Sequence, residues 1–294
     1  MTIQNNNAHD LNKQRLMDAW AIIQQHADAG MDLLPNPYRL AFNDPEFLAR
    51  QEVRGVRLQL ELLKPELAQQ QHQIDHTVVV YGSARVLPMD TVQAMLEEAR
   101  QKQDAAVLAQ EQHLLLGAEY YEAARSFARI VARYSHGRSR DQHFYICTGG
   151  GPGIMEAANR GAHEAGEPTI GLNITLPHEQ SSNPYITPGL NFKFHYFALR
   201  KMHFMLRAKA LVTFPGGFGT LDELFEILTL VQTGKSKQVP IVLYGSDYWK
   251  RVLHLEFLAE AGMIDQDDLL LLRYADTPQE AWEHIVKFYR LAPV

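Results

Sequence analysis

Two short segments of the chain combine glycines with acidic residues in a pattern that could hold a phosphate group. Thr148–Glu156 reads TGGGPGIME, and Phe214–Glu223 reads FPGGFGTLDE. Each follows an apolar run typical of a strand and precedes a stretch with helical spacing. Glycine lets the backbone approach a phosphate closely, and the first turn of a helix offers unpaired N–H groups and the positive end of its dipole. The pattern predicts two phosphate-binding loops.

Each glycine segment could instead be a tight turn, rich in glycine only because the chain reverses there. A single short motif would leave this alternative open, because such motifs often occur by chance. Here there are two segments, and Gly82-Ser83 closes a third strand-like run. The carboxyl ends of parallel strands meet at one edge of a sheet, where ligands bind. The combination favours phosphate binding over chain reversal.

Other nucleotide-binding patterns fit less well. Neither glycine segment has the third glycine of the G-x-G-x-x-G fingerprint, and the strand-like run Thr169–Ile174 ends without the acid that would hold a ribose. Gly234-Lys235-Ser236 resembles the end of a Walker A loop, but Thr229 stands at its first glycine position and a helix precedes it. The sequence therefore predicts neither NAD binding nor a Walker A site.

Reactive side chains lie close to the second glycine segment. Asp222 and Glu223 fall in the first turn of the expected helix, beside any phosphate or ribose bound there. However, Thr220 and Glu223 also have the spacing of a capping box, and acids are favoured at helix starts. The basic pair Arg200-Lys201 could contact the ligand or could lie on a solvated helix face. Both interpretations of each group stay open at this point.

The elements that must position these groups alternate between strands and helices. Short apolar strands between amphipathic helices predict an α/β protein, a Rossmann-like doubly wound parallel sheet covered on both faces. Strands are expected at Thr77–Tyr81, His143–Cys147, Thr169–Ile174, Phe192–Phe194, Ala210–Phe214 and, as the last strand, Val239–Tyr244, with helices at about 154–165, 197–208, 220–233 and 278–289.

The segments outside this alternation are expected to be helical. Apolar residues recur at helical spacing between residues 11 and 70, which predicts an N-terminal helical extension over 1–72 before a Rossmann-like domain over 73–294. The connection between the first two strands is too long for one crossover helix. We expect a helical insert at about 88–116, carrying a helix at Met95–Leu116, and a separate crossover helix at Tyr120–Tyr134.

Composition limits the classes of function. The 294 residues are 46% hydrophobic and 21% charged, and their net charge of −6 argues against a nucleic-acid partner. A single cysteine, Cys147, fits a reducing compartment, and no apolar run reaches the roughly 20 residues of a membrane helix. The N-terminus shows no apolar signal segment. We expect a cytoplasmic protein with a small-molecule ligand and no membrane partner.

Taken together, GGGPGIME, the Arg200-Lys201 pair and PGGFGTLDE resemble the Lonely-guy (LOG) family, formerly called possible lysine decarboxylases. The PGGxGTxxE signature is complete at Pro215–Glu223, and the resemblance covers roughly Asp75–Tyr289. It implies a Rossmann-like fold and a phosphoribohydrolase that cleaves purine or cytokinin riboside 5′-monophosphates to the free base and ribose 5-phosphate, an AMP nucleosidase type of hydrolase. The alternative is a non-catalytic nucleotide or cofactor carrier on the same fold.

The resemblance also implies roles for individual residues. Glu223 would be the catalytic carboxylate and Arg200 its partner at the ribose. The implied phosphate ligands are Gly216, Gly217, Gly219 and Thr220, with Gly82 and Ser83 also in the pocket; the first loop and the basic pair add Gly150, Gly151, Gly153 and Lys201 as candidate contacts.

Three further expectations complete the sequence-based picture. Because the family is oligomeric and the N-terminal helices are amphipathic, we expect at least a homodimer. No metal is expected, since the histidines show no ligand spacing, and no cofactor, since no lysine has a pyridoxal-phosphate context. Phe197 stands where smaller family members carry Met, so adenine is at least as good a candidate base as a cytokinin.

Overall fold

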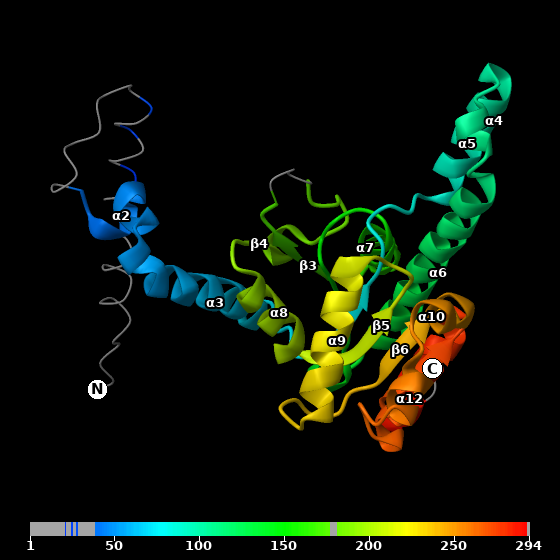
Figure 1. Cartoon of the computed structure of the whole chain (residues 1–294). Helices are drawn as coiled ribbons and strands as arrows, with labels where there is room; N and C mark the ends of the chain where they lie inside the picture. Colours follow the sequence, from blue (N-terminus) through cyan, green and yellow to red (C-terminus); the bar gives the residue numbers. More distant parts are fainter. Residues whose placement is uncertain (1–20, 22–24, 26–27, 29–38, 177–180, 293–294) are drawn as a thin grey trace. The chain divides into compact units, whose positions relative to one another are not determined.

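The computed structural model describes residues 21, 25, 28, 39–176 and 181–292 (Figure 1). The chain divides into two compact units, Met1–Leu60 and Glu61–Val294, earlier than the boundary predicted after residue 72. The helical pattern predicted from residue 11 onward falls, as far as residue 38, largely outside the described residues.

Short helical segments make up the described part of the first unit. They are η2 (Ala41–Asn43), α2 (Pro45–Ala49), η3 (Gln51–Val53) and the first part of α3 (Arg54–Gln71). Helix α2 begins at Pro45 because the Asp44 side chain accepts hydrogen bonds from the backbone N–H groups of Glu46 and Phe47, both at 3.1 Å. The helical character predicted for residues 39–70 is confirmed.

A seven-stranded parallel sheet is the centre of the second unit. The strands are β1 (Thr77–Tyr81), β2 (Tyr145–Thr148), β3 (Thr169–Ile174), β4 (Asn191–Phe194), β5 (Ala208–Thr213), β6 (Ile241–Tyr244) and β7 (Leu272–Ala275). Their order is β4-β3-β2-β1-β5-β6-β7, and every neighbouring pair is parallel. The order reverses between β1 and β5, which is where such sheets bind ligands. The predicted fold class is confirmed.

Helices cover both faces of this sheet (Figure 1). They are α4 (Met89–Lys102), α5 (Ala105–Leu108), α6 (Glu111–Ser135), α7 (Ile154–Glu164), α8 (Phe197–Leu206), α9 (Phe218–Gln232), α10 (Ser246–Val252), α11 (Leu255–Glu260) and α12 (Pro278–Tyr289), with the short helices η4 (Arg140–Gln142), η5 (Pro188–Leu190) and η6 (Gln266–Leu271). Side chains alternate along a strand, so Val78 and Val80 join the core formed with α6, α7 and α12. Val79 and Tyr81 join the core formed with α8, α9 and α10.

Two predictions about the elements are wrong. Val239–Tyr244 does not contain the last strand, because the edge strand β7 follows β6. The connection after β1 is helical as expected, but the helix predicted at Met95–Leu116 is divided among α4, α5 and the start of α6. Helix α6 then runs unbroken through the separation predicted between Leu116 and Tyr120. Gly117 lies inside α6, where a β-carbon would be 3.3 Å from Val86 Cγ1. The glycine there serves close packing and does not end the helix.

Candidate functional site

The three glycine segments meet at the carboxyl edge of the sheet. The Ser83 N–H donates to the Pro215 carbonyl, and the Ile154 N–H donates to the Ser83 carbonyl, both at 2.9 Å. A β-carbon on Gly82 would lie 2.7 Å from Ile154, and one on Gly153, whose φ is +71°, would lie 2.3 Å from the Ser83 carbonyl oxygen. Ser83 therefore ties both loops together, and the close approach requires glycine at these positions.

Buried side chains fix the first loop. Gly150, at φ +75°, donates its N–H to Thr148 Oγ1 at 3.0 Å. The Asn183 side-chain amide donates to the carbonyls of Gly150 and Gly151 at 3.2 and 3.0 Å, and Asn183 is only 5% exposed. The Gly150 N–H is therefore already hydrogen-bonded within the protein. A phosphate contact by Gly150, Gly151 or Gly153 stays a prediction. Asn183 was missed because nothing in its local sequence marks it.

The second loop leaves the start of α9 open. The helix begins at Phe218 with Gly217 as its N-cap, and no side chain caps it. Gly217 and Gly219 have no atom within 4 Å of a β-carbon position, whereas a β-carbon on Gly216 would meet Thr220 Oγ1 at 2.2 Å. The Gly216 carbonyl accepts a hydrogen bond from the Tyr248 hydroxyl at 2.7 Å. The loop is therefore held on one side and offers first-turn N–H groups on the other.

Glu223 does not cap this helix but pairs with Arg200. Arg200 Nη1 lies 2.9 Å from Glu223 Oε1, and the two side chains are 9% and 13% exposed. The capping-box alternative for Thr220 and Glu223 is wrong, because α9 starts too early for Glu223 to occupy the third helical position. The structure thus joins the two residues that the family resemblance had placed together.

The surroundings of Arg200 hold its guanidinium at the loop edge. Its Nε donates to the Leu172 carbonyl at 2.6 Å, and its guanidinium carbon lies 5.0 Å from the centre of the Phe204 ring. A β-carbon on Gly149 would lie 2.5 Å from Arg200 Nη2, so the first glycine loop borders the guanidinium. The buried ion pair and both loops therefore belong to one region.

Burial dominates the electrostatics of this region. It raises the pKa of Glu223 above the ordinary glutamate value of 4.5, while the charge and hydrogen bond of Arg200 act in the opposite direction. Burial, and then the charge of Glu223, raises the pKa of Tyr81 well above its usual range. Tyr81 was missed in the sequence, although its place directly before Gly82-Ser83 is a usable signal.

Other candidate groups are engaged elsewhere. Lys201 Nζ lies 2.9 Å from Asp222 and 3.0 Å from Glu226, so two carboxylates hold it. Glu156 accepts a hydrogen bond from the Tyr121 hydroxyl at 2.8 Å. Within the described part of the chain, no group of three or more His, Cys, Asp or Glu side chains could hold a metal ion, and no helix is long and apolar enough to cross a membrane.

This chain, an α/β protein with a buried carboxylate–arginine pair at two glycine loops, is similar to several known proteins. The family model described as "Possible lysine decarboxylase" matches residues 155–285. The cytokinin riboside 5′-monophosphate phosphoribohydrolase LOG of Oryza sativa subsp. japonica is 29% identical over 136 residues, which are 45% of this chain and 54% of that protein. The phosphoribohydrolase LOG4 of Arabidopsis thaliana is 26% identical over 135 residues, 45% of this chain and 61% of that protein.

Together these matches confirm the resemblance to the Lonely-guy family, although the chain spans little more than half the length of these curated relatives. Among solved structures, a molybdenum cofactor binding protein from Rippkaea orientalis has a TM-score of 0.46 at 17% identity, covering 73% of this chain and 98% of that one. A Moco carrier protein from Chlamydomonas reinhardtii has a TM-score of 0.45 at 20% identity, covering 74% and 99%.

Proposed function

We propose that the protein hydrolyses the N-glycosidic bond of nucleoside 5′-monophosphates, releasing the free base and ribose 5-phosphate. The observation that carries this proposal is the buried Arg200–Glu223 ion pair at the edge where the glycine loops meet. A pure binding protein would need the loops but not a carboxylate held beside them. The activity named for the two phosphoribohydrolase relatives supports the same class of reaction.

The proposed reaction divides the work between the loop and the ion pair. The first turn of α9, with Gly216, Gly217, Gly219 and Thr220, would bind the phosphate. As the bond from the ribose to the base breaks, positive charge develops on the sugar, and the Glu223 carboxylate would stabilise it. The same carboxylate would orient the attacking water and accept its proton, while the base leaves with the bonding electrons and takes up a proton from solvent, to which Glu223 then releases its own. Arg200 would hold Glu223 and the ribose hydroxyls.

The base is the less constrained part of the substrate. Phe197 at the start of α8 is 50% exposed, so it is available to a planar ring. We propose adenine as the base and AMP as the first substrate to examine, with a cytokinin riboside 5′-monophosphate as the comparison.

The test is adenine release from AMP and from adenosine at equal concentrations, followed by chromatography. We expect AMP to be hydrolysed and adenosine to be a poor substrate, because the phosphate supplies most of the positioning. Comparable turnover of both would contradict the role of the loops. Saturable AMP binding without any adenine would contradict hydrolysis and support a nucleotide carrier.

We also propose that the protein works as a homo-oligomer of at least two copies in the cytoplasm. Large apolar side chains are exposed on adjoining elements of the second unit, namely Leu206 of α8 and Phe218 and Phe225 of α9, and Phe218 is 92% exposed. The buried Cys147 supports a reducing compartment. Light scattering should give a mass of at least twice 33.4 kDa at micromolar concentration, and a monomer would contradict this.

A further inference from the structure

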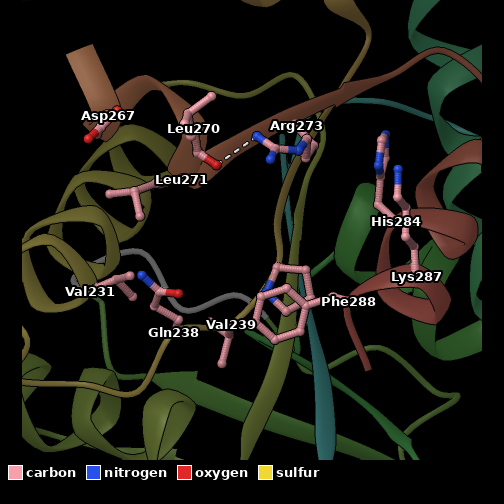
Figure 2. Close-up of a pocket in the computed structure, with 11 residues that line it drawn as sticks. Val231, Gln238, Val239, Asp267, Leu270, Leu271, Arg273, His284, Lys287 and Phe288 are labelled. Atoms are coloured by element: carbon pink, nitrogen blue, oxygen red, sulfur yellow. Dashed lines mark hydrogen bonds between the residues drawn. The ribbon is translucent and has the colours of Figure 1, made fainter. Parts of the chain in front are cut away.

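A cavity lies at the opposite edge of the sheet from the glycine loops. Its volume is about 540 Å³, and it is lined near the first residues of β6 and β7. Six of its lining residues carry the argument: Val231 at the end of α9, Val239 before β6, Arg273 on β7, and His284, Lys287 and Phe288 on α12 (Figure 2). Because parallel strands share one direction, this amino-terminal edge is remote from the Arg200–Glu223 pair.

The cavity has the size and the apolar lining of a small-molecule site. Ligand cavities commonly measure about 300–1,000 Å³ and combine apolar walls with a few polar groups. Val231 and Val239 are buried, and Phe288 is 45% exposed. An aliphatic or aromatic body that covers Phe288 would remove apolar surface from water, which favours binding.

Two cations at this cavity lack acidic partners. Arg273 Nη1 donates to the Leu270 carbonyl at 2.6 Å (Figure 2) and to the Leu272 carbonyl at 2.7 Å, which fixes the guanidinium at the cavity. Its Nη2 and Nε have no hydrogen-bond partner among the described residues. No carboxylate in the described part of the chain lies within ion-pair distance of Arg273 or Lys287. In a chain of net charge −6, this local excess of positive charge is a specific feature.

The remaining polar groups narrow the ligand further. The His284 ring donates a hydrogen bond from Nε2 to the Tyr274 carbonyl at 3.0 Å, so its orientation is set. Asp267 lines the side of the cavity away from Lys287 (Figure 2). A carboxylate there disfavours a second negative charge on the ligand, which favours a monoanion over a phosphate dianion.

We infer that this cavity is a second ligand site, specific for a small organic monocarboxylate with an apolar body. The carboxylate would lie between Arg273 and Lys287, and the apolar body would cover Val231, Val239 and Phe288. The inference does not depend on the proposed hydrolase activity, because the cavity shares no residue with the glycine loops or the ion pair.

Octanoate and its uncharged counterpart octanol are suitable probes in isothermal titration calorimetry on the full chain. We expect saturable binding of octanoate at a stoichiometry of one per chain and at least roughly tenfold weaker binding of octanol. Lys287→Glu should weaken octanoate binding at least roughly tenfold, Lys287→Arg should preserve it, and Lys64→Glu, a matched charge reversal on α3, should leave it unchanged.

The outcomes are separable from those of the hydrolase test. Equal affinities for octanol and octanoate would overturn the charge part of the inference, and an unchanged affinity in Lys287→Glu would place octanoate elsewhere. Absence of saturable octanoate binding would remove the site altogether. Adenine release measured on the same variants should match the unchanged chain, because Lys287 lies outside the proposed catalytic region.

Discussion

Two clusters of arginine and glutamate in this molecule contain the same ionisable groups, but the pKa of the glutamate is raised in one and lowered in the other. At the carboxyl edge of the sheet, Arg200 alone pairs with Glu223, and burial raises the pKa of that carboxyl group. On the surface of α6 and α7, Glu164 accepts hydrogen bonds from three arginines. These are Arg125 at 2.7 Å, Arg129 at 2.8 Å and Arg160 at 2.9 Å.

The difference lies in the balance between burial and the number of donors. Burial also acts to raise the pKa of Glu164, but the hydrogen bonds from its three arginines outweigh this effect and lower the pKa to about 2. At Glu223 a single arginine does not outweigh burial. Glu164 is therefore ionised at neutral pH, whereas Glu223 binds a proton more readily than an exposed glutamate does. Perturbation of this second kind is typical of functional sites.

Removing the charge of Glu223 is expected to have the largest effect. Glu223→Gln keeps the shape and hydrogen-bonding capacity of the side chain but loses the negative charge that would stabilise a cationic ribose. Adenine release from AMP should fall by roughly two or more orders of magnitude, while AMP binding should persist because the second loop holds the phosphate. Chromatography and calorimetry on the same preparation would measure both.

The matched control for this variant is Asp222→Asn. Asp222 is adjacent in sequence, exposed, and paired with Lys201 instead of Arg200. Loss of the Asp222 charge should change turnover little, because a surface ion pair contributes about 1 kcal/mol or less to stability. Normal adenine release by Glu223→Gln, or a larger loss in Asp222→Asn, would move the catalytic role away from Glu223.

Arg200→Ala should combine a catalytic loss with a structural one. It removes the hydrogen bond to the Leu172 carbonyl and leaves Glu223 buried without its partner. Breaking a buried pair in this way costs about 3–5 kcal/mol of unfolding free energy. We expect weaker AMP binding and slower adenine release together with a lower midpoint in urea. Arg200→Lys, which keeps the charge, should recover part of the stability; full activity in the alanine variant would contradict the assignment.

The pH dependence of adenine release and of stability should distinguish Glu223 from Glu164 without any mutation. If ionised Glu223 is the active form, adenine release should fall on acidification with a midpoint above 4.5, since burial raises the pKa of this group. A buried acid with a raised pKa binds its proton more tightly in the folded than in the unfolded chain. Its contribution to stability therefore decreases as pH rises from 4.5 through the folded pKa. An acid limb at or below 4.5 would contradict a role for Glu223.

Much of the sheet and of the helices that position the Arg200–Glu223 pair could be predicted from the sequence. The bounds of β1 and β3 were correct because these apolar runs are rich in β-branched residues and have Gly or Pro nearby. The bounds of α12 were correct because its amphipathic pattern begins at Pro278. Strand β7 was missed because LRYA is short, contains an arginine and directly follows a leucine run. Short apolar runs of this kind do not distinguish helix from strand.

The site was predictable only in part. The motif pointed to Glu223 and Arg200, but local sequence left a capping box as a competing explanation for Glu223. That question depended on where α9 begins and on a contact between residues 23 positions apart in the chain. Engagement of Lys201 by Asp222 and Glu226, and of the first loop by Asn183, also depends on tertiary contacts that a single sequence does not encode locally.

Glu164→Gln should have the smallest effect and should act on stability alone. Glu164 has a lowered pKa, so it stabilises the fold above the unfolded value of 4.5 and loses this contribution as pH falls toward 2. Its side chain is 28% exposed, and solvent screening reduces what each ion pair contributes. We therefore expect the amide to lower the unfolding free energy by about 1 kcal/mol at neutral pH, with adenine release unchanged. Urea denaturation at pH 7 and at pH 3 gives the sharper comparison, because the difference between the two chains should shrink at the lower pH as Glu164 approaches its own protonation. A difference that stays constant with pH would show that packing, not charge, holds this cluster together, and a loss of turnover would end the division between a structural and a catalytic arginine–glutamate cluster.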